Sequence, residues 1–243
     1  MQSEMNTDII IVGCGVAGLY CALNLPKGKK ITIVTKSEAP KSDSFLAQGG
    51  ICVLRDEEDF KVFFEDTMKA GHYENNPDSV EIMIRSSQEV IGDLVSFGVQ
   101  FEKNGDRFHY TREGAHSRPR ILFHEDETGK EITSHLLETA RSRENITLIE
   151  NFTMVDLICD DNVCYGIIGH DADGNYIRIC ADYTVLATGG IGGLFKHSTN
   201  YRHLTGDALA LAIKYDIKLQ HIDYIQIHPT TLYTKKHLSL IHI

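Results

Sequence analysis

The order of apolar and polar residues along the chain predicts alternating strands and helices. Asp8–Val12 is a short β-branched run, which is typical of a buried strand. Apolar residues then recur at helical spacing from Leu19 to Leu25, and Pro26 and Gly28 end that helix. Ile31–Thr35 is predicted to be the next strand. These segments form a β-α-β unit of roughly thirty residues, the usual size of such a unit.

The middle of the chain predicts two further helices. Asp56 is placed to cap a helix that ends near Ala70, with Gly71 in a position suited to a left-handed residue. Asn76-Pro77 starts a second helix, which Gly98 closes. The buried face of this second helix is predicted to consist of Val80, Met83, Ile84, Val90, Ile91, Leu94 and Val95.

The second half of the chain is richer in strands. Phe101 to Glu127 is predicted to be mostly loop, with Arg112, Glu113, His116, Arg118 and Arg120 crowded together. After it we expect a helix at Glu131–Arg143, a strand at Ile146–Glu150, a three-stranded antiparallel meander at Met154–Cys159, Val163–Asp171 and Ile177–Ala181, a buried strand at Tyr183–Ala187, and a helix at Gly206–Tyr215. The turns of the meander fall at Asp160–Asn162 and Asp173-Gly174.

Composition narrows the class of protein. With 243 residues, 42% of them hydrophobic, the chain has enough apolar side chains for a substantial core. The formal net charge of −10 argues against nucleic acid as a partner. The apolar run Ile9–Val12 is too short to span a membrane and lacks the flanks of a signal peptide. We therefore expect a cytoplasmic protein.

The cysteines suggest neither disulfides nor a metal site. Their spacing contains no CxxC pair, and without secretion signals they are expected to be reduced thiols. No metal is expected, because paired ligand spacings are missing. We expect buried, inert thiols at Cys14, Cys21, Cys52, Cys159, Cys164 and Cys180.

The segment Gly13-Cys14-Gly15-Val16-Ala17-Gly18 matches a dinucleotide-binding fingerprint between a strand and a helix. Gly13 would permit a tight turn, Gly15 would let the backbone approach a pyrophosphate, and Gly18 would let helix pack on strand. The helix N-terminus then offers N–H groups and a positive dipole end to phosphates. The alternative is a glycine-rich turn that binds no ligand.

Two further positions bear on the identity of the dinucleotide. The second strand leads into Thr35-Lys36-Ser37, with Glu38 late, instead of the acidic residue that usually binds a ribose hydroxyl. This weakens an NAD assignment but allows FAD, whose ribose could use a backbone group, Ser37 or Glu38. Ala187-Thr188-Gly189-Gly190 follows a strand, and its small residues would let a bulky cofactor approach. By itself it could be only a strand-to-loop turn.

Five ordered motifs resemble the succinate dehydrogenase, fumarate reductase and L-aspartate oxidase family, from Asp8 to about Tyr233. They are Ala47-Gln48-Gly49-Gly50-Ile51, Thr111-Arg112-Glu113-Gly114-Ala115-His116-Ser117 with Thr128-Gly129 after it, Ala187-Thr188-Gly189-Gly190, Thr205-Gly206-Asp207-Ala208, and Gln226-Ile227-His228-Pro229-Thr230. The resemblance implies an α/β, Rossmann-like FAD-binding domain with an inserted antiparallel β-meander, in residues 1–222. Residues 223–243 would then start a second, capping domain that is truncated.

Two positions separate members of this family. Relatives that attach FAD covalently carry a His five residues before the Gln of the AQGG motif, where this chain has Asp43. The resemblance therefore implies non-covalent FAD. The segment Arg112-Glu113-Gly114-x-His116 is similar to the L-aspartate oxidase members, in which this Glu lies near the substrate amino group. A carboxylate beside an ammonium group favours L-aspartate over succinate.

The resemblance also implies site residues. For the cofactor they are Gly13, Cys14, Gly15, Val16, Ala17, Gly18, Lys36, Asp43, Ser44, Phe45, Leu46, Ala47, Gln48, Gly49, Gly50, Met154, Thr188, Gly189, Gly190 and Asp207, and for the substrate Glu113, Gln226 and His228. Some have structural alternatives: Gln48 could satisfy backbone groups in its loop, His228 could be a packed histidine, and Glu113 could be an ion-pair partner of the nearby arginines.

The activity that the resemblance implies is oxidation of L-aspartate to iminoaspartate, with electrons passed to O2 or fumarate. The product would supply quinolinate synthase in NAD biosynthesis. The arginine that serves as base in the family would lie beyond Ile243, so the 243-residue chain is expected to be inactive and poorly stable. The rival interpretations are a soluble fumarate reductase or succinate dehydrogenase flavoprotein subunit, a non-catalytic FAD-binding module, and a degenerate fragment without function.

Overall fold

The computed structural model describes residues 3–227, 232, 233, 238 and 239, and the chain divides into two compact units. The first, called the sheet unit, comprises Met1–Asp43 and Ala140–Ile243. The second, called the helical unit, comprises Ser44–Thr139. The division between a domain of residues 1–222 and a capping domain from 223 stays a prediction.

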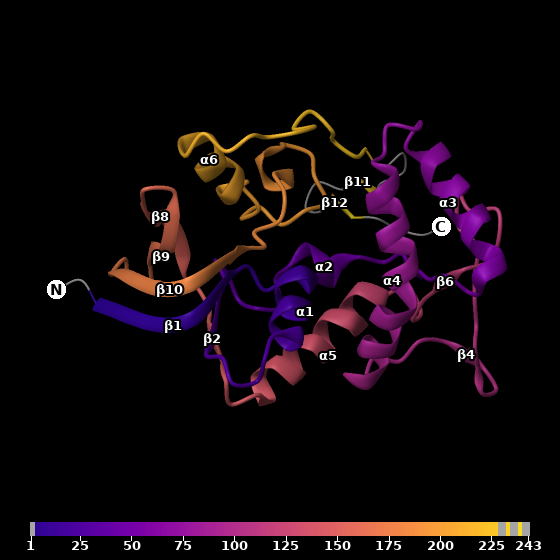
Figure 1. Ribbon diagram of the computed structural model, residues 1–243, viewed down its shortest axis with the longest axis horizontal. Helices are drawn as coiled ribbons and strands as arrows, with labels where there is room; N and C mark the ends of the chain where they lie inside the picture. Colours follow the sequence, from indigo (N-terminus) through magenta and orange to yellow (C-terminus); the bar gives the residue numbers. More distant parts are fainter. Residues whose placement is uncertain (1–2, 228–231, 234–237, 240–243) are drawn as a thin grey trace. The chain divides into compact units, whose positions relative to one another are not determined.

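The sheet unit contains most of the strands (Figure 1). Its elements are β1 (Ser3–Val12), α1 (Val16–Asn24), β2 (Ile31–Val34), β7 (Ile146–Ile149), β8 (Thr153–Asp160), β9 (Val163–His170), β10 (Tyr176–Leu186), the 3-10 helix η1 (Gly192–Leu194), α6 (Asp207–Lys214), β11 (Leu232–Tyr233) and β12 (Leu238–Ser239). The helical unit holds β3 (Ile51–Cys52), α3 (Glu57–Ala70), α4 (Pro77–Ser96), β4 (Lys103–Asn104), β5 (Arg107–Phe108) and β6 (Ile121–Leu122). Two helices, α2 (Asp43–Leu46) and α5 (Thr128–Ser142), run across the boundary.

One mixed sheet of six strands forms the frame of the sheet unit, in the order β7-β2-β1-β10-β9-β8. The first four strands are parallel, and β9 and β8 continue the sheet as antiparallel hairpins. This confirms an α/β domain with a mixed sheet. The antiparallel strands are continuous with the parallel ones, because β10 pairs with β1 on one side and β9 on the other (Figure 1).

The strand arrangement corrects two predictions. The segments Ile177–Ala181 and Tyr183–Ala187 are not separate strands, because a single strand, β10, runs through the first and to Leu186 of the second. The reason lies in its partner, since β1 starts at Ser3 and pairs with β10 along its whole length. The first residues of β1 are mostly polar, so the sequence pattern does not predict that they form a strand. The second half of β10 is also not buried, since the Tyr183 side chain is 65% exposed.

Both faces of the second half of β1 are covered, which explains its apolar run from Ile9 to Val12. Side chains of successive strand residues point to opposite faces. Ile10 and Val12 belong to a core shared with Met154 of β8 and Leu211 of α6. Ile11 faces the other way, where its side chain lies against Gly18 of α1. The buried strand and the amphipathic helix predicted here are therefore confirmed.

The hairpin between β8 and β9 has the turn predicted for it. Asp160 pairs with Val163, so the loop consists of Asp161 and Asn162. Both loop residues have positive φ, 45° and 63°, which is the type I′ geometry that suits the twist of a two-residue hairpin. Asn and Asp tolerate this conformation better than most residues.

In the helical unit, the predicted cap at Asp56 and the predicted helix start at Asn76-Pro77 are confirmed. The Asp56 side chain accepts a hydrogen bond from the Asp59 N–H at 2.9 Å, and Asn76 caps α4 through the Ser79 N–H at 3.0 Å. Gly71 is not left-handed, as its φ is −89°. Its lack of a side chain serves close packing instead, because a Cβ there would lie 1.9 Å from the Asn75 side-chain oxygen.

Helices α3 and α4 pack together around a small core that includes Leu54, Phe63, Met68, Val80 and Ile84. Four of the predicted buried positions of α4 are buried: Val80, Ile84, Ile91 and Leu94. The prediction was wrong for Met83 and Val95, which are 50% and 40% exposed, and Val90 is half-buried. The apolar stripe on α4 is wider than the surface that α3 covers.

The cysteines are free thiols, as expected, but their predicted burial holds for one of them only. Cys14 is buried, Cys159 is exposed, and Cys21, Cys52, Cys164 and Cys180 are half-buried. Cys159 lies in the hairpin strand β8, close to its turn, where one face meets solvent. In the part of the chain that the structure describes, no cluster of three potential metal ligands occurs. The described helices include none that is long and apolar enough to cross a bilayer.

Candidate functional site

The glycine turn after β1 and the small-residue segment after β10 lie side by side in the sheet unit. Gly13 has a φ of +114°, and a Cβ there would lie 2.1 Å from the Ala187 carbonyl oxygen. The Ala187 N–H donates to the Val12 carbonyl at 2.8 Å, so the two strand ends are hydrogen bonded. The structure therefore joins the two dinucleotide signatures at the carboxyl ends of neighbouring parallel strands, where open α/β sheets bind ligands.

The first turn of α1 presents its start to solvent. The helix begins at Val16, which is 39% exposed, and its N-cap residue Gly15 provides no side-chain cap. Gly18 is buried, and a Cβ there would lie 2.0 Å from the Gly13 carbonyl oxygen. The predicted roles of Gly13 in the turn and Gly18 in helix packing are thus confirmed. An uncapped helix start beside such a turn suits an anionic phosphate group.

Cys14 differs from its neighbours in the fingerprint. Its side chain is buried, and its Sγ–H donates to the Ala39 carbonyl at 3.3 Å. Burial raises the pKa of the Cys14 thiol above its usual value, and the hydrogen bond with Thr35 does not offset this. Cys14 therefore fixes the loop after β2, and only its backbone is available to a ligand.

Lys36 and Asp207, both predicted cofactor residues, meet in the sheet unit. The Lys36 ammonium group donates to the Asp207 carboxylate at 3.0 Å and to the Thr205 hydroxyl at 2.7 Å. Thr205 also donates to Asp207 at 2.6 Å. Asp207 is the first residue of α6, where a negative charge suits the helix dipole. Lys36, Thr205 and Asp207 therefore form a polar triad in which each residue is hydrogen bonded to the other two.

Asp43 anchors the long loop between β10 and α6. Its carboxylate accepts from the Tyr201 N–H at 3.0 Å and from the Asn200 side-chain amide. Asn200 in turn packs against Gly192, where a Cβ would lie 1.8 Å from its side-chain oxygen. The same loop is closed at its base by the Gly206 N–H, which donates to the Gly190 carbonyl at 3.1 Å. Sequence reasoning missed Asn200, because an Asn in a loop carries no signal of its own.

A second residue missed from the sequence is Glu150. Its carboxylate accepts from the Ala39 N–H at 2.9 Å and pairs with Arg141 at 2.9 Å. Glu38 pairs with Lys41 at 2.8 Å on the surface, and its contact with a ribose hydroxyl stays a prediction. The acidic group at the end of the loop after β2 is therefore supplied by Glu150, which follows the neighbouring strand β7 directly. Its position immediately after a strand was the available signal.

In the helical unit, the AQGG segment lies against Glu113. The Gly50 N–H donates to the Glu113 carboxylate at 3.4 Å, and a Cβ at Gly49 would lie 3.7 Å from the same carboxylate. The side-chain oxygen of Gln48 is buried and has no hydrogen-bond partner among the described residues. A buried polar atom without a partner is costly, so Gln48 is suited to bind a ligand group. The alternative that Gln48 satisfies its own loop is not supported for this oxygen.

Glu113 forms no ion pair within the described residues, so the structural ion-pair alternative is not borne out. The arginines near it bind other carboxylates. Arg120 is completely buried and pairs with Asp59 at 2.8 Å and with Asp66 at 2.7 Å. Arg118 lies 3.9 Å from Asp59. Glu113 is exposed and keeps a negative charge that these cations do not neutralise directly.

The remaining predicted residues have mixed outcomes. Met154 is buried in the core of the sheet unit, so its assignment to the cofactor stays a prediction. Gln226 is exposed, and its contact with substrate also stays a prediction. His228 lies outside the described residues. At the start of α5, the Gly129 N–H donates to the Ala47 carbonyl at 2.8 Å and fixes the end of α2.

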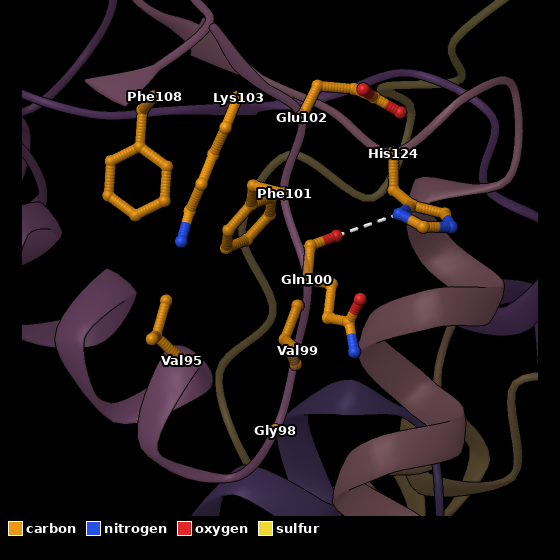
Figure 2. A pocket seen from close by; sticks show the side chains of 9 residues that line it. All are labelled: Val95, Gly98, Val99, Gln100, Phe101, Glu102, Lys103, Phe108 and His124. Carbon is orange, nitrogen blue, oxygen red and sulfur yellow. Dashed lines mark hydrogen bonds between the residues drawn. The ribbon is translucent and has the colours of Figure 1, made fainter. Parts of the chain in front are cut away.

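A cavity of about 400 Å³ in the helical unit contains none of the predicted site residues (Figure 2). Figure 2 shows Phe101, Phe108 and Lys103 around it, and the His124 Nδ1–H donating to the Gln100 carbonyl at 2.8 Å. The Lys103 ammonium group lies 5.6 Å from the centre of the Phe108 ring.

The fold of the sheet unit and the geometry of its glycine turn define a dinucleotide-binding α/β domain. Comparison with known proteins identifies the family and the dinucleotide. Residues 8–242 match the family described as FAD binding domain. The chain therefore belongs to the FAD binding domain family, and FAD is its cofactor.

Several relatives are similar to this chain. An L-aspartate oxidase of Clostridium perfringens is 48% identical over 229 residues, which are 94% of this chain and 52% of that protein. An L-aspartate oxidase of Clostridium acetobutylicum is 45% identical, over 95% of this chain and 53% of that protein. The chain thus spans about half the length of the curated relatives it matches.

Solved structures show the same fold. A flavocytochrome c3 fumarate reductase in its open conformation superposes with a TM-score of 0.85 at 26% identity, over 98% of this chain and 45% of that one. Mycobacterium smegmatis Sdh1 in complex with UQ1 gives a TM-score of 0.81 at 30% identity, over 87% of this chain and 38% of that one. The chain resembles the succinate dehydrogenase and fumarate reductase flavoproteins, as the sequence motifs indicated.

Proposed function

We propose that the protein carrying this chain is an FAD-dependent L-aspartate oxidase, which converts L-aspartate to iminoaspartate. The observation that supports this most directly concerns Glu113. Its carboxylate lies against the AQGG segment and has no ion-pair partner among the described residues. The similarity to L-aspartate oxidases at 48% and 45% identity supports the same proposal.

The residues present fit the cofactor. The absence of a side chain at Gly13 lets the turn lie against the Ala187 backbone, and the buried side-chain oxygen of Gln48 has no hydrogen-bond partner among the described residues. On the proposal, residues Gly13–Gly18 hold the pyrophosphate through backbone N–H groups, and residues Ser44–Gly50 contact the flavin part. Bound FAD supplies the redox chemistry by taking up the two electrons that leave the substrate.

Glu113 would recognise the substrate by charge. A carboxylate near the L-aspartate ammonium group gains Coulomb energy, whereas succinate offers no cation to the same position. The Gly50 N–H donates to this carboxylate and so holds it in one orientation. Fixing the substrate ammonium group also fixes the neighbouring carbon atom from which hydrogen is removed.

Further parts of the proposal rest on the resemblance alone. Asp43 cannot form the histidine linkage of covalent relatives, so FAD is proposed to bind without a covalent bond. O2 or fumarate would accept the electrons, and Gln226 and His228 would contact the dicarboxylate. A cytoplasmic location, a capping domain and a functional link to quinolinate synthase in NAD biosynthesis belong to the same proposal.

Anaerobic titration of the protein that carries this chain tests the activity. We expect L-aspartate to reduce the flavin and so bleach the visible absorbance of its oxidised form. Succinate should leave this absorbance unchanged. Bleaching by succinate alone would favour a fumarate reductase or succinate dehydrogenase subunit. A flavin that stays oxidised with every dicarboxylate would favour a non-catalytic FAD-binding module.

Substitution of Glu113 tests how the substrate is recognised. In Glu113→Gln we expect the KM for L-aspartate to rise by roughly tenfold, since loss of a charge-assisted contact with the substrate ammonium group is worth on the order of 1.4 kcal/mol. Glu127→Gln is the matched control, because Glu127 is an exposed glutamate of the helical unit that pairs with Lys130 at the surface. Equal effects of the two substitutions would remove Glu113 from the substrate site.

A further inference from the structure

A buried cluster of charges lies beneath the Glu113 loop in the helical unit. Arg120 is its centre: its Nε and Nη2 donate to the two oxygens of Asp59 at 3.1 and 2.8 Å. Its Nη1 donates to Asp66 Oδ2 at 2.7 Å and to His116 Nδ1 at 3.1 Å. Arg120 is fully buried and Asp59 almost so, and a buried guanidinium is tolerated only with such partners. The cluster is therefore a rigid support.

Asp66 connects this support to the loop. One of its oxygens, Oδ2, accepts from Arg120, from the Ser117 N–H at 2.9 Å and from the Ser117 hydroxyl at 2.8 Å. Burial opposes ionisation of Asp66, but the hydrogen bonds from the Ser117 N–H, Arg120 and the Ser117 hydroxyl outweigh it and lower the pKa of Asp66 below its usual value. The carboxylate is thus charged when it holds the loop.

His116 makes a second connection. Because Arg120 has only donors, His116 Nδ1 must accept, and the proton of the neutral ring lies on Nε2. Nε2 then donates to Cys52 Sγ, 3.4 Å away in β3. Cys52 lies two residues after Gly50, whose N–H holds Glu113. The cluster therefore touches the loop at Ser117 and His116, and also the strand that continues from the AQGG segment.

The loop needs such anchors because its backbone is strained. The His116 N–H donates to the Glu113 carbonyl at 3.3 Å, which closes a turn over Gly114 and Ala115. Ala115 has a φ of +67°, a left-handed conformation that residues with a Cβ rarely adopt. A strained residue persists only where its surroundings hold it. Here the turn is held at Glu113 by Gly50 and at Ser117 by Asp66.

We infer that Asp66 is a positioning residue for substrate recognition, which orders the turn from Glu113 to Ser117 and so fixes the Glu113 carboxylate for the substrate ammonium group. This inference rests on the proposed function. On this inference Asp66 acts through Ser117 and touches neither substrate nor cofactor. Its effect should therefore be confined to ligands that carry an ammonium group.

The test compares three variants of the flavin-loaded protein that carries this chain. Asp66→Ala removes the anchor, and Asp66→Asn keeps an oxygen that can accept from the Ser117 N–H. Glu65→Ala is the matched control, because Glu65 neighbours Asp66 in α3 but accepts from the Tyr73 hydroxyl at 2.6 Å and does not touch the turn. Steady-state kinetics with L-aspartate and inhibition by succinate are measured for each.

In Asp66→Ala we expect the KM for L-aspartate to rise at least tenfold, with kcat changed less than threefold and the inhibition constant of succinate unchanged. Asp66→Asn should recover most of the loss, and Glu65→Ala should behave like the wild type. Equal changes for L-aspartate and succinate, or no change for either, would overturn the inference, since a merely structural role does not distinguish the two ligands.

Hydrogen–deuterium exchange separates this inference from the proposed function. In the protein without substrate, we expect the segment 111–118 to exchange faster in Asp66→Ala than in the wild type or in Glu65→Ala. Unchanged exchange there would overturn the inference whatever the substrate is. If the wild type fails to oxidise L-aspartate while the exchange changes as expected, the proposed function fails and the anchoring of the turn by Asp66 stands.

Discussion

Lys36 and Asp207 are 171 residues apart in the sequence and form a salt bridge of 3.0 Å in the sheet unit. Lys36 follows β2, and Asp207 starts α6, so the pair ties the first half of the sheet to the last described helix. Both side chains are about 30% exposed, and the pair therefore competes with water. Its contribution to stability is therefore small, and its expected role is in binding the cofactor.

Replacing Lys36 should weaken cofactor binding. In Lys36→Met the Asp207 carboxylate loses its cation, and an unpaired negative charge near the anionic phosphates of FAD is unfavourable. We expect the Kd for FAD to rise roughly tenfold. Lys41→Met is the control, because Lys41 pairs with Glu38 at the surface. Flavin fluorescence titration measures both, and equal Kd values would show that the Lys36 pair has no part in the cofactor site.

Gly13 should tolerate no side chain. In Gly13→Ala the new Cβ would lie 2.1 Å from a backbone oxygen, in a conformation with positive φ. We expect the free energy of unfolding to fall by about 3 kcal/mol. Gly28→Ala, where no atom lies within 4 Å of the added Cβ, should change it by less than about 1 kcal/mol. Chemical denaturation followed by circular dichroism gives both values, and similar losses would contradict the close packing of Gly13 against Ala187.

Ala115 offers a stabilising substitution. Because its φ is +67°, Ala115→Gly removes the steric cost of a left-handed residue, and we expect a gain of up to about 1 kcal/mol in the free energy of unfolding. Gly114→Ala is the control in the same turn, since Gly114 has open space around it and should change little. A loss of stability in Ala115→Gly, measured by denaturation, would show that the turn is not strained.

His116 predicts a pH dependence of stability. Burial and the neighbouring Arg120 lower its pKa below the ordinary 6.5, and the opposing effects of Asp66, Glu113 and Asp59 are smaller. The unfolded chain therefore binds a proton near pH 6.5 that the folded protein resists. The stability due to this group is complete above about pH 6.5 and is lost as the pH falls through the lower, folded-state pKa.

The substitution His116→Asn removes this titration and keeps an oxygen that can accept from Arg120. We expect its free energy of unfolding to fall less than that of the wild type between pH 7.5 and pH 5.5. Denaturation at several pH values measures the difference. Parallel pH profiles for the two proteins would show that His116 does not titrate differently in the folded state.

Much of the fold could be predicted from local patterns. The β-α-β unit around the glycine turn follows from β-branched runs, a helical period and Pro26, which are all local signals. β1 was predicted too short, because its first residues are polar and only their pairing with β10 makes them a strand. Burial of Met83 and Val95 was wrong for a related reason: an apolar period shows which face is apolar, but the partner decides how much of it is covered.

Part of the candidate site could also be predicted from local sequence motifs. Gly13 and Gly18 have requirements that glycine alone meets, so their motif predicts their geometry. The partners of Asp43 and Arg120 could not be predicted, because they depend on loops that are distant in sequence. Asn200 and Asp66 carry no motif, and only the folded chain shows which group each one binds.

The strands β2 and β7 are neighbours in the sheet, with Ile31 opposite Ile146, although the whole helical unit lies between them in the sequence. The chain must close a loop of over a hundred residues before β7 can join the edge. Loop closure of this length slows folding more than it reduces stability. Until the helical unit has folded, the side of β2 that pairs with β7 has no partner. Its unpaired backbone N–H and C=O groups can then form hydrogen bonds with other chains, which favours aggregation.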